Sequence, residues 1–253
     1  MAAAAGAPRQ NEAVNKEAWD RLAARRGDAT PVGAVQYGQD LPSETDLRLI
    51  GDVRGKRVLD LGCGGGENAV AFAKQGAHTI ALDTSHGQLS LARSLAETEE
   101  IRVEWHESDA ADLAFMRADS IDVALSVGLL SEVEDIDRLF RQVHRVLRHG
   151  SPFVFAYEHP LALCVGREGG EPGGLPFGRL EMRRSYYDTG PIEQVRDGEK
   201  LTVWPRTIAD VFAALHRAGY RVDALIEPQP TRSADPGPLL PGSIVWRARK
   251  EGV

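Results

Sequence analysis

The sequence has little cysteine and no long apolar run, and each scarcity excludes a class of protein. Cys63 and Cys164 are its only cysteines, too few for a disulfide framework or a tetrahedral zinc site, so we expect a reducing, cytoplasmic setting. No apolar stretch approaches the ~20 residues of a membrane span. Residues 1–10 are rich in alanine but lack a basic segment and a long apolar core, which predicts a tail rather than a signal peptide.

Positive charge is scarce as well. Lysine and arginine number 30 against 37 aspartates and glutamates, and no lysine-rich block occurs. This balance argues against a nucleic-acid partner, because a polyanion is repelled by an acidic surface. The 253 residues suit one α/β domain with an insertion.

Glycine, in contrast, is concentrated in one stretch. The apolar run Val58–Leu61, interrupted by Asp60, leads into four glycines within five positions, and an apolar helical pattern then extends from Asn68 to Gly76. A strand, a glycine turn and a helix in this order bring backbone N–H groups and a helix N-terminus to a nucleotide-like ligand.

The charges of this turn indicate which ligand it holds. A pyrophosphate-binding turn has the pattern Gly-x-Gly-x-x-Gly, but counting from Gly62 the third glycine position is Glu67, and Asp60 lies just upstream. Two carboxylates repel a diphosphate and attract a ligand with an amine and a sulfonium, since a charge pair a few Å apart is worth roughly 1 to 4 kcal/mol near a surface. S-adenosyl-L-methionine is such a ligand.

At Asp60, Gly62, Gly64 and Gly66 the sequence resembles the first motif, Asp-x-Gly-x-Gly-x-Gly, of the class I S-adenosylmethionine-dependent methyltransferases. The resemblance implies a three-layer, Rossmann-like α/β fold with a seven-stranded, mostly parallel sheet. Residues 143–160 resemble a bacterial small-molecule branch that includes quinone-biosynthesis and secondary-metabolite enzymes, although Arg148-His149-Gly150-Ser151 replaces the usual Arg-Pro-Gly-Gly turn.

Apolar periodicity predicts the remaining elements. Strands are expected at 77–82, 101–105, 121–127, 152–157, 220–226 and 244–246, and helices at 11–26, 44–51, 86–98, 135–148 and 208–218, the last with Ile208, Val211, Phe212 and Leu215 facing inward. The resemblance implies that the first helix is a lid over the cofactor, so residues 1–43 would form a tail and this lid helix, and residues 44–253 the methyltransferase domain. An insertion at about 161–205, after the fifth strand, would pair Arg184–Asp188 with Leu201–Trp204 as a hairpin over the substrate.

Residues at the strand ends are the expected cofactor ligands. Asp83 closes the second strand about 20 positions after the turn, where a carboxylate holds a ribose diol, although it could simply cap the helix that starts near Ser85. The resemblance places Asp109 and Ala110 at the adenine, or otherwise in a polar loop, and Ser126 beside the methionine part. The full expected set is Asp60, Gly62, Cys63, Gly64, Asp83, Thr84, Asp109, Ala110 and Ser126.

Candidates for catalysis follow the fifth strand. His159 and Glu158 are the best-placed groups to accept a proton from a nucleophile, and Tyr186 is a weaker candidate. A lone histidine beside a proline is more often structural, and this alternative stays open. Carboxylates such as Asp109 and Asp112 form no compact ligand set, so no metal is expected.

Aromatic side chains are the expected walls of the substrate pocket, although they could instead give the insertion a core of its own, and the first helix could be a strut rather than a lid. The expected substrate contacts are Trp19, Tyr37, Glu132, Tyr157, Tyr187 and Trp204.

The sequence therefore predicts methyl transfer from S-adenosyl-L-methionine to a nitrogen, oxygen or carbon atom of a small aromatic or heterocyclic metabolite of natural-product type, giving S-adenosyl-L-homocysteine. An NAD(P)-dependent oxidoreductase, disfavoured by Asp60 and Glu67, and a non-catalytic cofactor-binding scaffold remain as alternatives. We expect no membrane partner, and the exposed first helix and the insertion are compatible with a homodimer.

Overall fold

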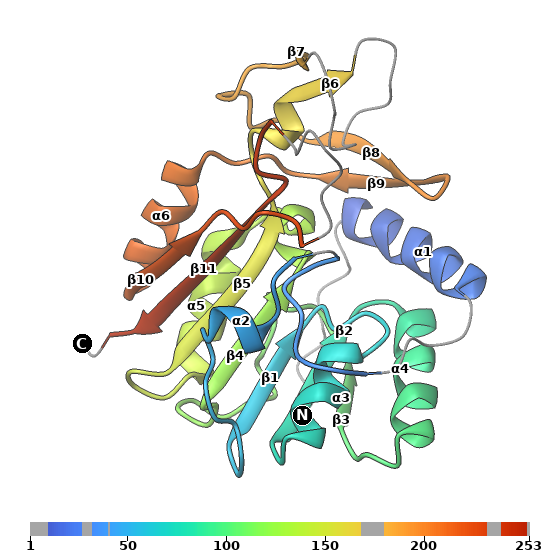
Figure 1. Cartoon of the computed structure of the whole chain (residues 1–253), viewed down its shortest axis with the longest axis vertical. Helices are drawn as coiled ribbons and strands as arrows, with labels where there is room; N and C mark the ends of the chain where they lie inside the picture. Colours follow the sequence, from blue (N-terminus) through green and yellow to red (C-terminus); the bar gives the residue numbers. More distant parts are fainter. Residues whose placement is uncertain (1–9, 27–31, 40, 168–179, 232–238, 252–253) are drawn as a thin grey trace.

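A seven-stranded sheet forms the centre of the protein (Figure 1). The computed structural model describes residues 10–26, 32–39, 41–167, 180–231 and 239–251. The strands of the sheet, in spatial order, are β10 (Tyr220–Ile226), β11 (Ser243–Lys250), β5 (Pro152–Glu158), β4 (Val123–Val127), β1 (Arg57–Leu61), β2 (His78–Asp83) and β3 (Glu104–Glu107). Only β11 runs antiparallel to its neighbours, so the predicted mostly parallel sheet is confirmed.

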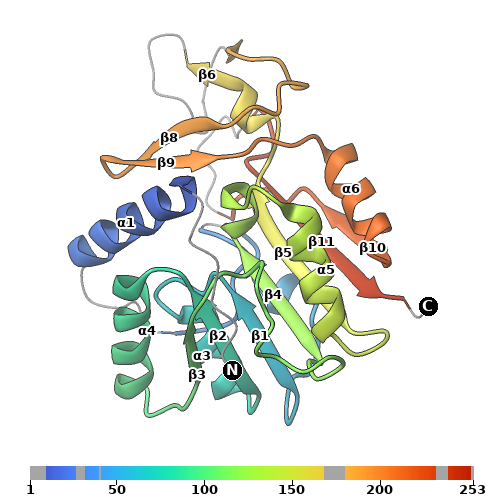
Figure 2. The same cartoon turned by 180° about the vertical axis from the view of Figure 1, so that it is seen from behind.

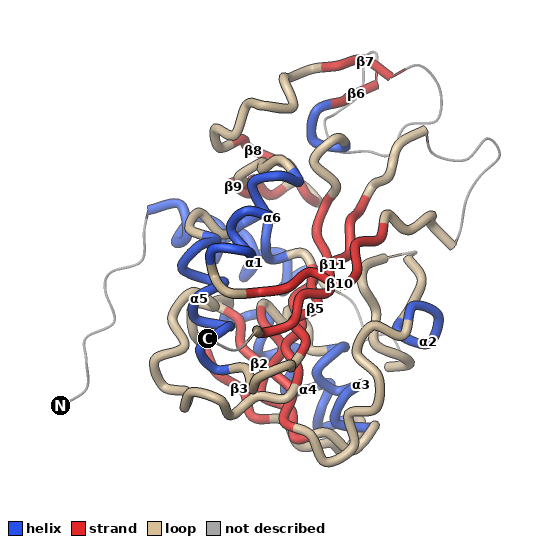
Figure 3. Tube along the Cα trace, turned by 90° about the vertical axis from the view of Figure 1, so that its left-hand side faces the viewer, coloured by secondary structure: helices blue, strands red, loops and turns tan. Residues whose placement is uncertain are grey.

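Helices cover both faces of the sheet and complete the predicted three layers. The helices are α1 (Gln10–Arg25), α2 (Glu44–Leu47), α3 (Glu67–Lys74), α4 (His86–Thr98), α5 (Ile136–Val146) and α6 (Ile208–Arg217), with short 3-10 turns η1 (Leu129–Glu132) and η2 (Ala162–Cys164). α5 and α6 bury apolar residues against one face, while α3 packs on the other (Figure 3).

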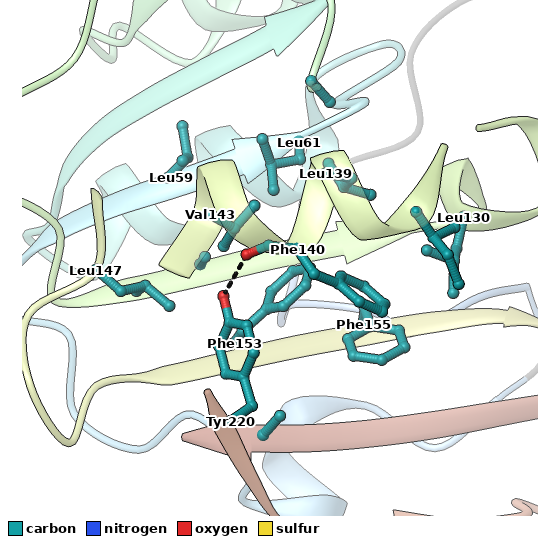
Figure 4. Close-up of a cluster of buried hydrophobic side chains, with 14 of the residues drawn as sticks. Leu59, Leu61, Leu130, Leu139, Phe140, Val143, Leu147, Phe153, Phe155 and Tyr220 are labelled. Carbon is teal, nitrogen blue, oxygen red and sulfur yellow. Dashed lines mark hydrogen bonds between the residues drawn. The ribbon is translucent and has the colours of Figure 1, made fainter. Parts of the chain in front are cut away.

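Aromatic rings fill the core between α5, α6 and the sheet (Figure 4). The ring centroids of Phe153 and Phe155 lie 4.9 Å apart, and the Tyr220 hydroxyl donates a hydrogen bond of 3.3 Å to the Phe140 carbonyl. Because such an interior is densely packed, it holds the carboxyl ends of β4 and β5 in fixed positions.

The first helix and the insertion lie beyond the carboxyl ends of the parallel strands (Figures 1 and 2). The insertion consists of two antiparallel pairs, β6 (Val165–Arg167) with β7 (Leu180–Met182) and β8 (Ile192–Arg196) with β9 (Glu199–Val203). The Asn15 side chain joins α1 to β9, since it donates to the Thr202 carbonyl at 2.8 Å and accepts from the Thr202 N–H at 2.7 Å. Together these elements cover the carboxyl edge of the sheet, which is the edge where α/β sheets bind ligands.

Several expected elements are corrected. Residues 184–188 form bends and turns, and β9 pairs instead with β8 through a tight turn in which Asp197 and Gly198 both have positive φ. An Asp-Gly pair between alternating residues is a strong hairpin signal that we overlooked. The predicted helix 44–51 is only four residues long, the third strand begins at Glu104, and Phe212 is 52% exposed rather than inward.

Among the helices that the structure describes, none has the length and apolarity needed to cross a membrane.

Candidate active site

The turn between β1 and α3 requires glycine at two positions, Gly62 and Gly66. Gly62 and Gly66 have φ angles of +66° and +84°, which side chains rarely adopt. A Cβ atom on Gly62 would also lie 2.9 Å from the Leu129 Cβ, and one on Gly66 would lie 2.7 Å from the Ala92 Cβ. The turn is therefore pressed between η1 and α4, with its backbone at the carboxyl edge of the sheet.

Asp83, at the end of β2, ties the turn to the start of α4. Its carboxylate accepts hydrogen bonds from the N–H groups of Gly64 and Ser85, both at 2.9 Å. The capping role that we considered is thus present, next to the exposed Thr84. Each oxygen retains a further lone pair, so ribose binding by Asp83 stays a prediction.

Asp60 is the unusual group of the site. It is 2% exposed near the carboxyl end of β1, and its Oδ2 atom has no hydrogen-bond partner among the described residues. Burial, with smaller contributions from the charges of Asp83 and Glu67, raises the pKa of Asp60 to about 7. Glu67 differs from our expectation because it forms an ion pair with Arg26, so the electrostatic argument rests on Asp60.

Two more buried polar atoms near the turn lack partners among the described residues: the Ser126 hydroxyl at the end of β4 and the Gln88 Oε1 atom. The Gln88 oxygen lies 3.8 Å from the position that a Cβ on Gly64 would occupy. Unpaired acceptors beside a buried carboxylate fit a ligand with an amine and a sulfonium, and they disfavour a diphosphate.

The loop after β3 keeps both readings of Asp109 open. The Asp109 Oδ1 atom accepts a hydrogen bond of 2.8 Å from the Ala111 N–H, which is a loop-capping contact, and Ala110 is buried beside it. Adenine binding by Asp109 and Ala110 stays a prediction, as does a contact from Cys63, which is buried in the turn.

Helix α1 covers the glycine turn, and the polar residues that hold it there were missed in the sequence. The Asp20 carboxylate accepts from the Ser85 hydroxyl at 2.6 Å and from the Gly87 N–H at 2.8 Å. Just after the helix, Arg26 Nη1 lies 2.4 Å from the position of a Cβ on Gly65. In the sequence, Asp20 is one of several charged residues between the apolar positions of the first helix. Nothing in that pattern distinguishes it from a solvent-exposed residue.

Trp19 and Glu132, both predicted to contact the substrate, are brought together. The Trp19 indole N–H and the Asn15 amide donate to the Glu132 carboxylate at 2.8 and 3.2 Å. Burial, with a smaller contribution from Asp83, raises the pKa of Glu132 to about 7, although Trp19, Arg196 and Asn15 act against this. The Arg196 guanidinium lies over the Trp19 ring, 5.3 Å from its centroid.

The candidates on β5 face the insertion. Glu158 accepts a hydrogen bond of 2.7 Å from the Gln194 amide, and burial raises the pKa of its carboxyl. The Tyr157 hydroxyl is buried without a partner among the described residues, and burial raises its pKa. Trp204 is buried beside η1, with its N–H donating to the Ser131 carbonyl at 2.7 Å.

The geometry does not support the role of base predicted for His159. Its side chain is 1% exposed, Nδ1 accepts from the Leu161 N–H at 3.1 Å, and Nε2 lies 3.0 Å from the Glu227 carboxylate. With these partners, the ring is assigned as neutral, with its proton on Nε2. Burial lowers the pKa of His159 below its usual value, which also favours the neutral ring. Neither nitrogen is free to accept a substrate proton, so the structural role that we considered is the one the geometry favours.

Three tyrosines differ from expectation in where they lie. Tyr37 is buried among apolar residues on the α3 side of the sheet, with its hydroxyl bonded to Glu44. Tyr187 is 83% exposed, and the Tyr186 hydroxyl accepts from the Ile208 N–H at 3.0 Å, at the start of α6. Tyr37 therefore belongs to the core. The sequence did not predict this, because an aromatic residue in a loop gives no signal of which face it reaches.

No group of three or more histidine, cysteine, aspartate or glutamate side chains that could hold a metal ion occurs in the described ranges. A cavity of about 430 Å³ does occur, but at the amino edge of the sheet, lined by Arg57, Phe115 and Arg117 among others. It contains none of the predicted site residues.

Comparisons with known proteins point in one direction. A family profile described as "Methyltransferase domain" matches residues 58–150. The solved structure of an S-adenosylmethionine-dependent methyltransferase from Mesorhizobium loti is 30% identical, covers 81% of this chain and 95% of its own, and has a TM-score of 0.66. A putative S-adenosylmethionine-dependent methyltransferase from Listeria monocytogenes, at 24% identity and with the same TM-score, shares the fold over 81% of this chain and 96% of its own.

Curated relatives match over a shorter region. The ubiquinone biosynthesis O-methyltransferase of Hahella chejuensis is 33% identical over 102 residues, and the demethylmenaquinone methyltransferase of Clavibacter sepedonicus is 40% identical over 108. These matches cover 40% and 42% of this chain and 43% of each relative, so the chain spans less than half the length of these two relatives.

Proposed function

We propose the function from the premise that this chain belongs to the family of S-adenosylmethionine-dependent methyltransferases: it transfers the methyl group of S-adenosyl-L-methionine to a nucleophilic nitrogen, oxygen or carbon atom of a small metabolite. The observation that carries the proposal is the buried carboxylate of Asp60, whose Oδ2 lacks a partner among the described residues, beside the glycine turn. A cationic ligand supplies the counter-charge that this carboxylate lacks.

The chain contributes mainly by positioning. When bound, S-adenosyl-L-methionine supplies a methyl carbon activated by its sulfonium leaving group. The glycine turn and Asp83 hold the donor, and α1 with the β8–β9 hairpin excludes water from the edge of the sheet. Alignment of two reactants in this way can contribute effective molarities of roughly 10⁵ M or more.

The substrate that we propose is a flat, partly polar ring of the phenol or quinone type. Trp19, Tyr157 and Trp204 supply aromatic surface. Glu132, at the end of η1, and Glu158, at the end of β5, supply carboxylates. Relatives named for the methylation of ubiquinone and menaquinone precursors support this class. Glu158, at the end of β5, replaces His159 as the preferred base for a phenolic nucleophile, since its carboxylate has only one hydrogen-bond donor, Gln194, among the described residues.

Calorimetry with three ligands tests the cofactor. We expect S-adenosyl-L-methionine and S-adenosyl-L-homocysteine to bind and NADH not to bind. Binding of NADH together with no affinity for either sulfur compound would revive the oxidoreductase alternative.

Turnover tests the rest of the proposal. A panel of phenols, hydroquinones and heterocyclic amines is incubated with methyl-labelled donor. Transfer of label identifies the substrate class, and the position of the labelled methyl group in the product identifies the acceptor atom. The scaffold alternative would be favoured by tight donor binding without label transfer to any member of the panel, with the Glu158→Gln variant and the native chain alike in both measurements.

A further inference from the structure

Glu132 connects the glycine turn to the first helix. Its 3-10 turn, η1, begins at Leu129, whose Cβ lies 2.9 Å from the position of a Cβ on Gly62. At the other end of η1, the Glu132 Oε2 atom accepts the hydrogen bonds from Trp19 and Asn15 of α1. Only two residues thus separate the residue that contacts the turn from the residue that contacts the helix.

The charges around Glu132 leave it without a full counter-charge. Asp83, at the end of β2, opposes its ionisation, and Arg196 of β8 favours it. Arg196 lies over the Trp19 ring, and in the described part of the chain it forms no ion pair with Glu132. Asp60, which is buried, and Asp83, which is half-buried, add two further carboxylates to the same edge of the sheet.

We infer that Glu132 is a specificity-determining residue that makes the seating of α1 depend on the positive charge of the methyl donor. This inference rests on the proposed function. A sulfonium in the site favours the ionised carboxylate, and a hydrogen bond to an ionised acceptor is roughly twice as strong as one to a neutral acceptor. The donor therefore strengthens the bonds from Trp19 and Asn15, and α1 closes over it.

Methyl transfer reverses this effect. The bond from carbon to sulfur breaks with its electron pair left on sulfur, the methyl carbon bonds to the nucleophile, and the nucleophile's proton passes to a base and then to water. The sulfonium becomes a neutral thioether, so the site loses one positive charge. Glu132 then takes up a proton, its bonds to α1 weaken, and the product is released.

Hydrogen exchange of the α1 amides in the full chain at pH 7 tests this coupling. We expect saturating S-adenosyl-L-methionine to slow exchange in α1 about fivefold more than saturating S-adenosyl-L-homocysteine, the size expected from strengthening two hydrogen bonds. In Glu132→Gln, which keeps an acceptor for Trp19 but has no charge, the two ligands should protect α1 equally.

Glu199→Gln is the matched control. Glu199 binds α1 through Arg21 and Arg25 at 2.6 and 2.5 Å, on β9 and away from the glycine turn. We expect this variant to loosen α1 with either ligand while the difference between the ligands persists.

Equal protection of α1 by both ligands in the native chain, or a difference that survives in Glu132→Gln, overturns the inference. Calorimetry of the same samples separates the two levels of argument, because absence of binding by both sulfur compounds refutes the proposed function, whereas normal binding with equal protection refutes only the role of Glu132.

Discussion

At the scale of single residues, the site is defined by polar groups that the fold leaves unpaired. Asp60 lies in a strand in which Val58, Leu59 and Leu61 are fully buried and apolar. A buried carboxylate is unfavourable unless it is neutral or paired, so its presence in this strand points to a ligand rather than to stability.

Asp60→Asn should separate these two effects. The folded-state pKa of Asp60, about 7, lies above its unfolded value, so its contribution to stability is fully present below the unfolded pKa of about 4 and is lost as pH rises through about 7. We expect the native chain without ligand to lose on the order of a few kcal/mol between pH 5 and pH 8, and Asp60→Asn to lose less. Urea unfolding at the two pH values measures this.

Donor affinity should change in the opposite direction, with Asp60→Asn binding S-adenosyl-L-methionine at least about tenfold more weakly, the size of one lost charge interaction. Exposed Asp52→Asn is the control and should alter neither quantity. If Asp60→Asn bound the donor normally, the carboxylate would not be its counter-charge.

His159→Ala tests the structural role of this histidine. The substitution leaves the Leu161 N–H without its acceptor and Glu227 without its donor, which should cost about 1 to 3 kcal/mol of unfolding free energy. His159→Asn places an acceptor near Nδ1 and should recover part of the loss. Thermal unfolding measures both variants, and a native melting temperature for His159→Ala combined with lost turnover would restore the catalytic reading.

At the scale of elements, the sequence predicted those whose ends carry local signals. Thr207 and Gly219 bracket α6, where Thr207 forms a capping box with Asp210 and Gly219 has a φ of +84°. The strands of the insertion could not be predicted in the same way. They are short, and β9 packs against α1 and η1, which are distant in the sequence. The sequence predicted a strand at 184–188 as the partner of β9. The Asp197-Gly198 turn instead pairs β9 with β8.

The α6 cap gives a prediction at this scale. Thr207→Ala removes the acceptor for the Asp210 N–H, now 3.0 Å away, and should destabilise the chain by about 1 kcal/mol. Thr207→Ser keeps the hydroxyl and should be nearly neutral. Denaturant midpoints at constant slope compare the two, and equal midpoints for alanine and serine would show that the cap contributes nothing.

At the scale of the whole molecule, α1 is held to the rest of the chain by ion pairs from its basic residues to acidic residues of other elements. Lys16, Arg21 and Arg25 of α1, with Arg26 beyond its end, pair with Glu107 on β3, Glu199 on β9 and Glu67 on α3. The sequence predicted the helix, and the family resemblance implied a place for it over the cofactor, which stays a prediction. It could not predict the pairing, because the acidic partners lie between 41 and 178 positions away.

Salt should therefore open α1 without unfolding the sheet. At about 1 M ionic strength the screening length falls to about 3 Å, so the half-exposed pairs of α1 weaken, whereas the apolar core between α5, α6 and β5 is unaffected. We expect trypsin to cleave the ligand-free chain within α1 several-fold faster at 1 M than at 0.05 M salt, with no change in the cleavage of the remaining domain. A short peptide substrate corrects for the effect of salt on trypsin itself. A corrected cleavage rate that does not depend on salt would mean that the ion pairs of α1 do not hold the helix in place. The hydrogen bonds of Trp19, Asn15 and Asp20 to Glu132, Thr202 and the start of α4 would then be sufficient.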